Sequence, residues 1–402
     1  MSWHATAGGV TAAQGFQASG LACGIKLRGK RDLALIVSER PALVAGMLTT
    51  NRLAAAPIQL CKPVLRRGKA QAIIANSGNA NACTGLQGLT DAKAMVEATA
   101  QALHLDPHLV LVASTGVIGR PMPIRRILPA IPEAVNALTS RGSHAAAEAI
   151  LTTDLVVKEV AVECLLDGKP VRIGGIAKGS GMINPTMATM FAFLTTDAAI
   201  TLPALRVALK HAVAHSFNAI TVDGDMSTND IVLLLANGAA GNKTLQAGDA
   251  GLGRFTRALT HVCETLAKAI VRDGEGATRL VTVEVRGAAS QSEAQKAART
   301  IANSLLVKTM VAGHDPNWGR VAAAVGASSA HLDPHRLAIA LGGIVVFQHG
   351  HPVRVNPLHL KRMFEHPEVT IDVHLGVGTS HARLWTCDLT EGYIRINAKY
   401  TT

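Results

Sequence analysis

Aromatic side chains are scarce in this sequence of 402 residues. Phe, Trp and Tyr together make up 3% of the chain, so few side chains are available to stack on nucleotide bases. The formal net charge of +11 comes from lysines and arginines in short, separate groups, which are typical of solvated surfaces. The composition therefore argues against nucleic acid as a partner and is compatible with small carboxylate substrates.

Long apolar runs and a secretion signal are also missing. The longest clearly apolar run, residues 231–236, is much shorter than the ~18 to 20 residues that a membrane-spanning helix needs. Residues 1–9 lack the charged and apolar regions of a signal peptide. We therefore expect a cytoplasmic protein with no membrane partner.

Cysteine pairs and common cofactor motifs are absent as well. The six cysteines lie far apart without a CxxC pair, which argues against zinc knuckles and a disulfide framework and predicts reduced, buried side chains. Walker A, GxGxxG, HExxH and Gly-x-Ser-x-Gly motifs do not occur, and the histidines show no ligand spacing. The sequence predicts no metal site and no resident cofactor.

Apolar residues, by contrast, are plentiful. They make up 48% of the chain, against 17% charged residues, so the chain can bury a large core. Its length exceeds that of one typical domain and predicts two domains or two lobes.

The apolar periodicity predicts a mixed α/β protein. Strands are expected at 33–37, 71–75, 109–113, in a hairpin over 156–176 that turns at Asp167-Gly168, directly after Thr189, and at 219–222, 231–236, 280–285, 305–311, 337–346, 369–375, 382–388 and the C-terminus. Helices are expected over 90–103 with Thr90 as N-cap, 144–150 with Ser143 as N-cap, 202–215, 254–272 and 290–304.

Two loops follow predicted strands in the first half of the chain. The loop 76–85 is rich in Asn and Gly and is either an anion-binding loop at a helix N-terminus or a plain strand–turn–helix connection. The next strand ends at Ser114-Thr115-Gly116. A Thr-Gly pair at a strand exit offers backbone N–H groups and a hydroxyl, which are the parts of an oxyanion hole, although simple turns have the same pattern.

Acidic residues stand out in two loops of the second half. Residues 223–230 hold three aspartates, which is compatible with a metal site or with the aspartyl nucleophile of haloacid-dehalogenase-type phosphatases. The alternative is that Ser227 to Asp230 cap the next strand through side-chain to backbone bonds; the spacing excludes an EF-hand. Glu275, between two glycines, is either a solvated turn residue or a ligand that approaches its partner closely.

The run from Lys178 to Thr196 delivers Thr189 to the start of a predicted strand. Two glycines and an Asn-Pro turn precede it, and the glycines permit backbone geometry that other residues resist. A strand-initial threonine is by itself ordinary, because its β-branched side chain suits a pleated surface.

Six segments, taken together and in order, resemble the ornithine acetyltransferase family, the glutamate N-acetyltransferases of arginine biosynthesis. They are 76–85, 114–116, 178–189, 221–230, 313–320 and 397–402. The resemblance spans the chain, and a match in six places is specific.

The resemblance implies a self-cleaving enzyme with an N-terminal nucleophile. Cleavage between Ala188 and Thr189 would leave an alpha chain of residues 1–188, with the N-terminal lobe, and a beta chain of residues 189–402, with the C-terminal lobe. Thr189 would then be both nucleophile and, through its freed α-amine, base.

The family's site residues carry over by position. Thr115 and Gly116 match its oxyanion hole, and the positions that match its substrate-binding residues are Thr152, Lys178, Thr189, Glu275, Asn397 and Thr402. Lys178 suits a carboxylate, and Glu275 suits an ammonium group. The implied reaction is ping-pong transfer of acetyl from N-acetylornithine to glutamate, releasing ornithine and N-acetylglutamate.

The resemblance also implies a fold and an assembly. The fold is two-lobed with a layered αββα core, and two alpha and two beta chains assemble together. Acetyl-CoA is a further possible acetyl donor, as a co-substrate. The sequence leaves two alternatives, a related N-terminal-nucleophile aminopeptidase or amidohydrolase that deacylates with water, and a basic binding protein without enzyme activity.

Overall fold

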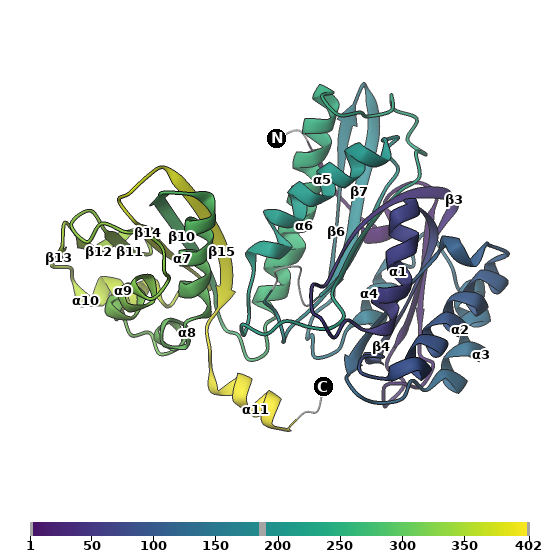
Figure 1. Cartoon of the computed structure of the whole chain (residues 1–402), viewed down its shortest axis with the longest axis horizontal. Helices are drawn as coiled ribbons and strands as arrows, with labels where there is room; N and C mark the ends of the chain where they lie inside the picture. The colour runs from purple at the N-terminus through teal and green to yellow at the C-terminus, as the bar shows by residue number, and fades with distance from the viewer. Residues whose placement is uncertain (1–2, 185–189, 400–402) are drawn as a thin grey trace. The chain divides into compact units, whose positions relative to one another are not determined.

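The computed structural model describes residues 3–184 and 190–399 (Figure 1). The predictions for Ala188, Thr189 and Thr402 therefore lie outside the described residues. The chain divides into two compact units. Of the described residues, unit 1 holds those up to Asn218 together with Met226–Ile270, and unit 2 holds Ala219–Asp225 and those from Val271 onward. The expected cleavage point thus falls within the span of unit 1.

Unit 1 is built on one nine-stranded sheet. Its strand order is β1-β6-β7-β8-β9-β3-β4-β5, with β2 also paired to β3. The strands are β1 Trp3–Thr6, β2 Phe16–Leu21, β3 Leu33–Leu48, β4 Lys69–Asn79, β5 Val110–Val117, β6 Lys158–Leu166, β7 Lys169–Lys178, β8 Phe191–Thr196 and β9 Ile231–Ala236.

Strand β3 joins two halves of this sheet. Its first part pairs with β2 and β4, and its last part pairs with β9. Because successive side chains of a strand point to opposite faces, Ala34 and Ile36 face one core while Leu33 and Leu35 face another. The core that contains Ala34 also takes in residues of β7, β8 and β9, so both halves of the sheet bury one face in it.

Helices cover the outer faces of these halves. Helices α2, Gly85–Leu103, and α3, Ile124–Asn136, cover the outer face of β3, β4 and β5. On the other half, Gly175 of β7 lies against Leu266 of α6, Ala250–Arg272, and α5, Leu202–Ala214, lies beside α6 (Figure 1). The layers run helix, strand, strand, helix, which is the expected αββα arrangement.

Two further helices border the shared core. They are α1, Ala56–Arg67, and α4, Ser143–Ile150, and both contribute buried side chains to that core. The end of α4 leads directly into the segment that carries Thr152, so packing in the core fixes where this segment begins.

The hairpin expected over 156–176 is confirmed. Strands β6 and β7 pair from Lys158↔Ala177 to Leu166↔Lys169. Asp167 and Gly168 both have positive φ, 50° and 75°, as a two-residue turn of this hand requires. The pairing places Lys158 and Lys178 at the same end of the sheet.

Unit 2 is a second, smaller α/β body. Its sheet has the order β13-β12-β11-β14-β10-β15. The strands are β10 Leu280–Ala288, β11 Ala338–Leu341, β12 Ile344–Gln348, β13 His351–Pro352, β14 Glu368–His374 and β15 Ser380–Cys387. The helices are α7 Gln291–Asn303, α8 Leu305–Ala312, α9 Trp318–Gly326, α10 Pro357–Met363 and α11 Glu391–Lys399. Apolar residues of α7, α8, α9 and α10 share one core with the sheet.

Three strand predictions in unit 2 are wrong. Residues 305–311 form α8, because Ser304 caps it and its buried residues recur at helical spacing. Residues 219–222 make only an isolated bridge between Ile220 and Trp385. The predicted C-terminal strand is helix α11, which has no buried residues. The single segment expected over 337–346 is a hairpin, β11 and β12, turning at two glycines.

Two predicted helix caps are also wrong. Helix α2 begins at Gly85, and Thr90 lies inside it with its hydroxyl donating to the Leu86 carbonyl at 3.1 Å. Gly142 is the N-cap of α4, while the Ser143 hydroxyl accepts from the Val10 N–H at 3.1 Å. By contrast, the helix expected over 290–304 is confirmed as α7, and Ser290 is its N-cap.

The cysteine prediction is partly correct. Four of the side chains are buried, but Cys83 is exposed and Cys23 is half-buried. No helix within residues 3–184 and 190–399 is long and apolar enough to cross a bilayer.

Candidate active site

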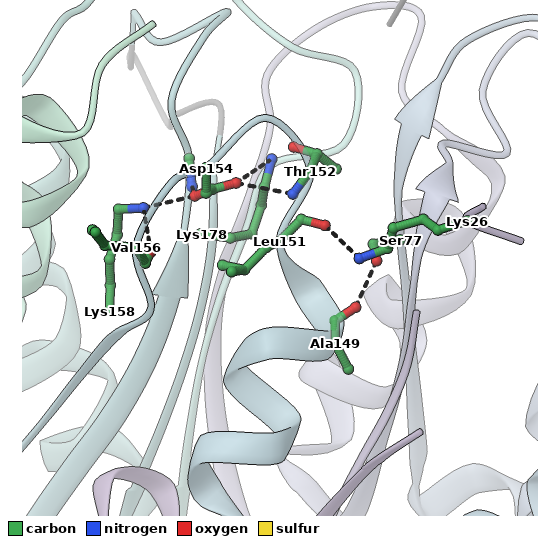
Figure 2. A network of polar contacts seen from close by, with 10 residues as sticks. Lys26, Ser77, Ala149, Leu151, Thr152, Asp154, Val156, Lys158 and Lys178 are labelled. Carbon is green, nitrogen blue, oxygen red and sulfur yellow. Dashed lines mark hydrogen bonds and ion pairs between the residues drawn. The ribbon is translucent and has the colours of Figure 1, made fainter. Parts of the chain in front are cut away.

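The carboxylate of Asp154 is the centre of a buried polar network in unit 1 (Figure 2). Its Oδ2 accepts the N–H of Thr152 at 3.0 Å, and its Oδ1 accepts the N–H of Gly179 at 2.7 Å. Lys158 Nζ donates to Oδ1 at 2.8 Å, and Lys178 Nζ lies 4.0 Å from Oδ2. Two residues expected to bind substrate, Thr152 and Lys178, therefore meet at one carboxylate.

The electrostatics of this network favour a bound anion. Burial alone would raise the pKa of Asp154, but the charges of Lys178 and Lys158 outweigh it and hold that pKa below its ordinary value. Two ammonium groups thus lie beside the Asp154 carboxylate. Because the Lys178 side chain is 9% exposed whereas that of Lys158 is 0% exposed, Lys178 is the better placed of the two to meet a carboxylate substrate.

Lys26 adds a third ammonium group to this region. Its Nζ donates to the Leu151 carbonyl at 2.9 Å (Figure 2). Burial and the charge of Lys178 lower its pKa to about 8, while Asp32 and Asp154 act in the opposite direction. The peptide group between Leu151 and Thr152 is therefore held at both of its polar atoms, its carbonyl by Lys26 and its N–H by Asp154.

Thr115 and Gly116 lie at the end of β5, still within the strand rather than after it. Thr115 is opposite Ser77 in the parallel pairing with β4, and Gly116 is opposite Gly78. Gly116 has φ 128°, and a Cβ there would lie 2.4 Å from the Gly78 carbonyl carbon. Only glycine fits, because a side chain would collide with backbone. The pair is half-buried, so its polar groups remain reachable.

Asparagine side chains brace this strand end. Asn229 donates from Nδ2 to the carbonyls of Ser114 and Ala80, both at 2.6 Å, and the Ser114 hydroxyl donates to Asn76 Oδ1 at 2.6 Å. Within the loop, Asn81 Nδ2 donates to the Gly88 carbonyl at 2.8 Å. The amides of loop 76–85 thus bind the protein's own backbone, which favours the plain connection over an anion-binding loop.

A hydrogen bond joins the two halves of the site. The Ser77 hydroxyl, beside Thr115, donates to the Ala149 carbonyl at 2.5 Å (Figure 2). Ala149 lies in the last turn of α4, directly before the segment of Leu151 and Thr152. The β5 end with Thr115 and the lysine network around Asp154 are therefore parts of one connected region of unit 1.

The acidic loop 223–230 does not form a metal site. Among residues 3–184 and 190–399, no group of three or more His, Cys, Asp or Glu side chains is close enough to hold a metal ion. Instead, Ser227 Oγ accepts the Asn229 N–H at 3.1 Å, which is the capping role that the sequence offered as the alternative. The phosphatase hypothesis loses its support.

Within unit 2, Glu275 and Asn397 are bonded to each other. Asn397 Nδ2 donates to Glu275 Oε2 at 2.7 Å. Glu275 is 6% exposed, so it is not a solvated turn residue. A Cβ at Gly276 would lie 2.3 Å from the Tyr393 nitrogen, so the glycine after Glu275 lets the start of α11 pack closely.

Negative charge gathers around this pair. Burial raises the pKa of Tyr393, and the charges of Asp223, Asp225 and Glu275 raise it further. A cluster of carboxylates of this kind attracts an ammonium group.

Several residues of these networks carry little signal in the sequence. Asp154 carries a weak signal, because it lies four residues before Lys158 at the edge of a predicted hairpin. In the sequence, Asn229 and Asp230 stand out only as members of an acidic loop. Met190 is buried and precedes β8, which confirms a strand directly after position 189.

The fold and the site together define a class of protein. It is a mixed α/β protein with a layered αββα core, in which a strand-end Thr-Gly pair lies beside a buried, lysine-rich carboxylate network. The sequence profile of the ArgJ family matches residues 17–402. The chain belongs to the ArgJ family.

Two sequence relatives match this chain over its whole length, and a solved structure matches part of it. The chain is 50% identical over 404 residues to the arginine biosynthesis bifunctional protein ArgJ of Symbiobacterium thermophilum, which covers 100% of both chains. It is 48% identical over 417 residues to the protein of the same description from Thermosynechococcus vestitus, with 100% of this chain and 99% of the relative covered. It is 44% identical to the crystal structure of the ArgJ protein from Bacillus halodurans, with a TM-score of 0.52, and 53% of this chain covers 100% of that one.

Proposed function

We propose that this chain is an acetyltransferase of arginine biosynthesis that moves the acetyl group of N2-acetyl-L-ornithine to L-glutamate. The observation that carries the proposal is the meeting of Thr152, Lys178 and Asp154 in one network, connected to the Thr115 strand end, in a chain of the ArgJ family. The names of the relatives, bifunctional proteins of arginine biosynthesis, support the same reaction.

The reaction runs in two half-reactions through an acetyl-Thr189 ester. The hydroxyl of Thr189 attacks the acetyl carbonyl, ornithine leaves, and the amine of glutamate then takes the acetyl group. A threonine hydroxyl is a weak nucleophile, whereas a free α-amine with a pKa of about 7.7 to 8.0 is a suitable base at neutral pH. Thr189 therefore serves only after cleavage of the bond to Ala188 has freed its amine.

A length relation supports this cleavage. Residues 189–402 would make up about 53% of the chain. The solved Bacillus halodurans chain is covered completely by 53% of this one, as expected if that chain is one product of such a cut. The division into chains of residues 1–188 and 189–402 stays a proposal.

The site residues divide by charge. Thr115 and Gly116 donate to the oxyanion of the tetrahedral intermediate. Thr152 and Lys178 bind the substrate's carboxylate. Glu275 and Asn397 bind an ammonium group, and Thr402 contributes its hydroxyl.

The remaining assignments follow the family resemblance. Acetyl-CoA is a second acetyl donor used as a co-substrate, and no resident cofactor is needed, because the nucleophile and base belong to the chain. Two alpha and two beta chains assemble in the cytoplasm, without nucleic acid or membrane as partners.

Thr189→Ala tests the proposal directly. The purified wild-type protein should run as two fragments and transfer acetyl from N-acetylornithine to glutamate without net hydrolysis. Thr189→Ala should run as one band of 41.8 kDa and be inactive, while Thr189→Ser keeps a hydroxyl and should still be cut. Acetate release in place of transfer would instead indicate an N-terminal-nucleophile hydrolase, and full activity of Thr189→Ala would refute the mechanism.

A further inference from the structure

Asn229 is a buried side chain that holds two strand ends at once. It lies just before β9 and is 5% exposed. Its Nδ2 donates to the carbonyls of Ala80 and Ser114, both at 2.6 Å. Ala80 follows β4, and Ser114 is the residue of β5 directly before Thr115. One side-chain amide therefore ties the start of β9 to the ends of β4 and β5.

The orientation of the Asn229 side chain is fixed by its partners. Its Oδ1 accepts the Thr228 hydroxyl at 2.5 Å, and the backbone N–H of Asn229 donates to Ser227 Oγ at 3.1 Å. A primary amide has two hydrogens to donate and one oxygen that accepts. Both hydrogens go to backbone carbonyls and the oxygen receives a hydroxyl, so a rotation of the amide would break all three bonds.

The Ser114 carbonyl controls the position of the next residue, Thr115. The carbonyl and the Thr115 N–H belong to the same planar peptide group, so a bond to the oxygen fixes the plane from which Thr115 starts. Ser114 is 1% exposed and Ala80 is 2% exposed, so little solvent reaches either carbonyl. Asn229 is therefore the partner that holds this peptide group from outside the sheet.

The pairing of β4 with β5 is irregular at this point. Asn79 is paired with both Thr115 and Val117, and the register shifts between Gly78 and Asn79. Gly116 has φ 128°, far from the φ of a regular strand. An irregularity of this kind disrupts the ladder locally, so the ladder constrains the strand end less than it does a regular strand. The bonds of Asn229 supply the missing constraint.

We propose that Asn229 is a positioning residue for the oxyanion hole, which holds Thr115 and Gly116 where they meet the oxyanion of the tetrahedral intermediate. This inference rests on the proposed function, since it concerns the oxyanion hole of that reaction. If the chain is cut as proposed, Asn229 belongs to the beta chain and Ser114 to the alpha chain. One chain then sets the geometry of the oxyanion hole that the other carries.

Catalysis by an oxyanion hole depends on where its donors lie. They stabilise the transition state when they are about 2.7 to 3.1 Å from the oxyanion, and a displacement of about 1 Å can lower a rate by about 100-fold. Asn229→Asp keeps the size of the side chain but replaces the donor with a second acceptor. A carboxylate facing the carbonyls of Ala80 and Ser114 repels both, so the strand end should shift.

The test compares acetyl transfer from N-acetylornithine to glutamate by wild type, Asn229→Asp, Thr115→Ala and the double variant. Asn242→Asp is the matched control, because Asn242 is also buried and its Nδ2 donates to the carbonyls of Ala199 at 3.1 Å and Lys243 at 2.7 Å. Asn242 follows the opposite end of β9. Rates are expressed per mole of cleaved enzyme, measured on denaturing gels, and folding is compared by circular dichroism.

We expect Asn229→Asp to lower kcat by about 100-fold and to leave KM for N-acetylornithine unchanged, because only an interaction of the transition state is lost. Asn242→Asp should behave as wild type. The double variant should be less than about ten-fold slower than Thr115→Ala, because residues that act as a unit are non-additive. Independent effects would instead multiply to about 10⁴-fold or more.

The outcomes separate this inference from the proposed function. Effects that multiply, a wild-type kcat for Asn229→Asp, or a rise in KM alone would each overturn the role of Asn229. An unchanged rate for Thr115→Ala would remove the oxyanion hole on which the inference depends, and a wild type that transfers no acetyl would overturn the proposed function itself.

A second variant covers a failure of Asn229→Asp to fold. Asn229→Ser keeps one donor, and its kcat should fall by a smaller factor with the same non-additivity toward Thr115→Ala. If neither variant yields folded, cleaved protein although Thr115→Ala and Asn242→Asp do, Asn229 serves the fold as a whole and the inference is refuted.

Discussion

Asp154 and Lys158 form an ion pair whose two side chains are both 0% exposed, with 2.8 Å between Lys158 Nζ and Asp154 Oδ1. The same carboxylate also lies 4.0 Å from the Nζ of Lys178. The pair therefore holds Lys178 and the Thr152 backbone in place at the end of the β6–β7 hairpin. Asp154 therefore contributes both to the stability of the fold and to the position of the proposed substrate-binding residues.

Asp154→Asn should destabilise the protein. The change leaves two buried ammonium groups without their carboxylate, and breaking a buried pair in this way costs about 3 to 5 kcal/mol. Urea denaturation at pH 7 measures the free energy of unfolding. Asp167→Asn, at the exposed turn between β6 and β7, is the control and should change it by no more than about 0.5 kcal/mol, because Asn also tolerates positive φ.

The difference in the free energy of unfolding between wild type and Asp154→Asn has a defined pH dependence. Because the pKa of Asp154 is lowered in the folded state, the stabilisation is fully present above the ordinary carboxyl pKa of about 3.9. It is lost only as pH falls through the lowered folded value. The difference between wild type and Asp154→Asn should stay constant from pH 8 to about pH 5, and a loss within that window would contradict the assignment.

Thr115→Ala should slow acetyl transfer and leave the fold intact. Loss of one oxyanion-hole donor typically lowers kcat by about 100- to 1000-fold. Steady-state kinetics on N-acetylornithine and glutamate measure the effect, and Thr90→Ala, on the exposed face of α2, should behave as wild type. An unchanged rate for Thr115→Ala would remove this residue from the oxyanion hole.

Gly116→Ala should be more damaging than its size suggests. A Cβ would meet backbone of Gly78 at 2.4 Å, and φ is 128°, so the strand end would have to move. We expect loss of soluble, active protein. Gly119→Asn is the matched control, because its φ is 76° with open space around it and Asn tolerates this region; normal activity of Gly116→Ala would show that the strand end adapts.

Lys178→Met should weaken substrate binding rather than folding. Hydrogen bonds to charged groups contribute about 1.5 to 3 kcal/mol, so KM for glutamate should rise ~10- to 100-fold. Lys169→Met tests the other end of the same strand, where the side chain is exposed, and should leave KM unchanged. Equal KM values for wild type, Lys178→Met and Lys169→Met would show that Lys178 does not bind the carboxylate of glutamate.

Local sequence signals predicted the structure correctly where turn residues fix the backbone geometry. The Asp167-Gly168 turn set the register of β6 and β7. These signals gave a wrong prediction where burial in the tertiary structure decides whether a segment forms a helix or a strand. Residues 305–311 are a mostly apolar run with three β-branched residues, which suits a strand by itself. They form a helix because the core of unit 2 accepts Val307, Met310 and Val311 on one face.

The residues of the site were likewise predicted only where a sequence pattern marks them. Motifs indicated Thr115, Gly116, Thr152 and Lys178, since those positions match a family pattern. Asp154 and Asp230 escaped notice, because a lone aspartate in a loop looks alike whether it is solvated or buried. Only the tertiary contacts show that both carboxyl groups are buried, and that N–H groups and lysines contact that of Asp154.

The sequence by itself determined the alternation of helices and strands over most of the chain, the main hairpin and the family to which the chain belongs. These follow from periodicity, turn residues and spacing, which are properties of neighbours along the chain. The tertiary structure decided which charges are buried together. Desolvation and Coulomb interactions depend on what lies nearby in space. Lys178 at the end of β7 and Asp154 in the segment after α4 are separated along the chain and come together only in the folded protein.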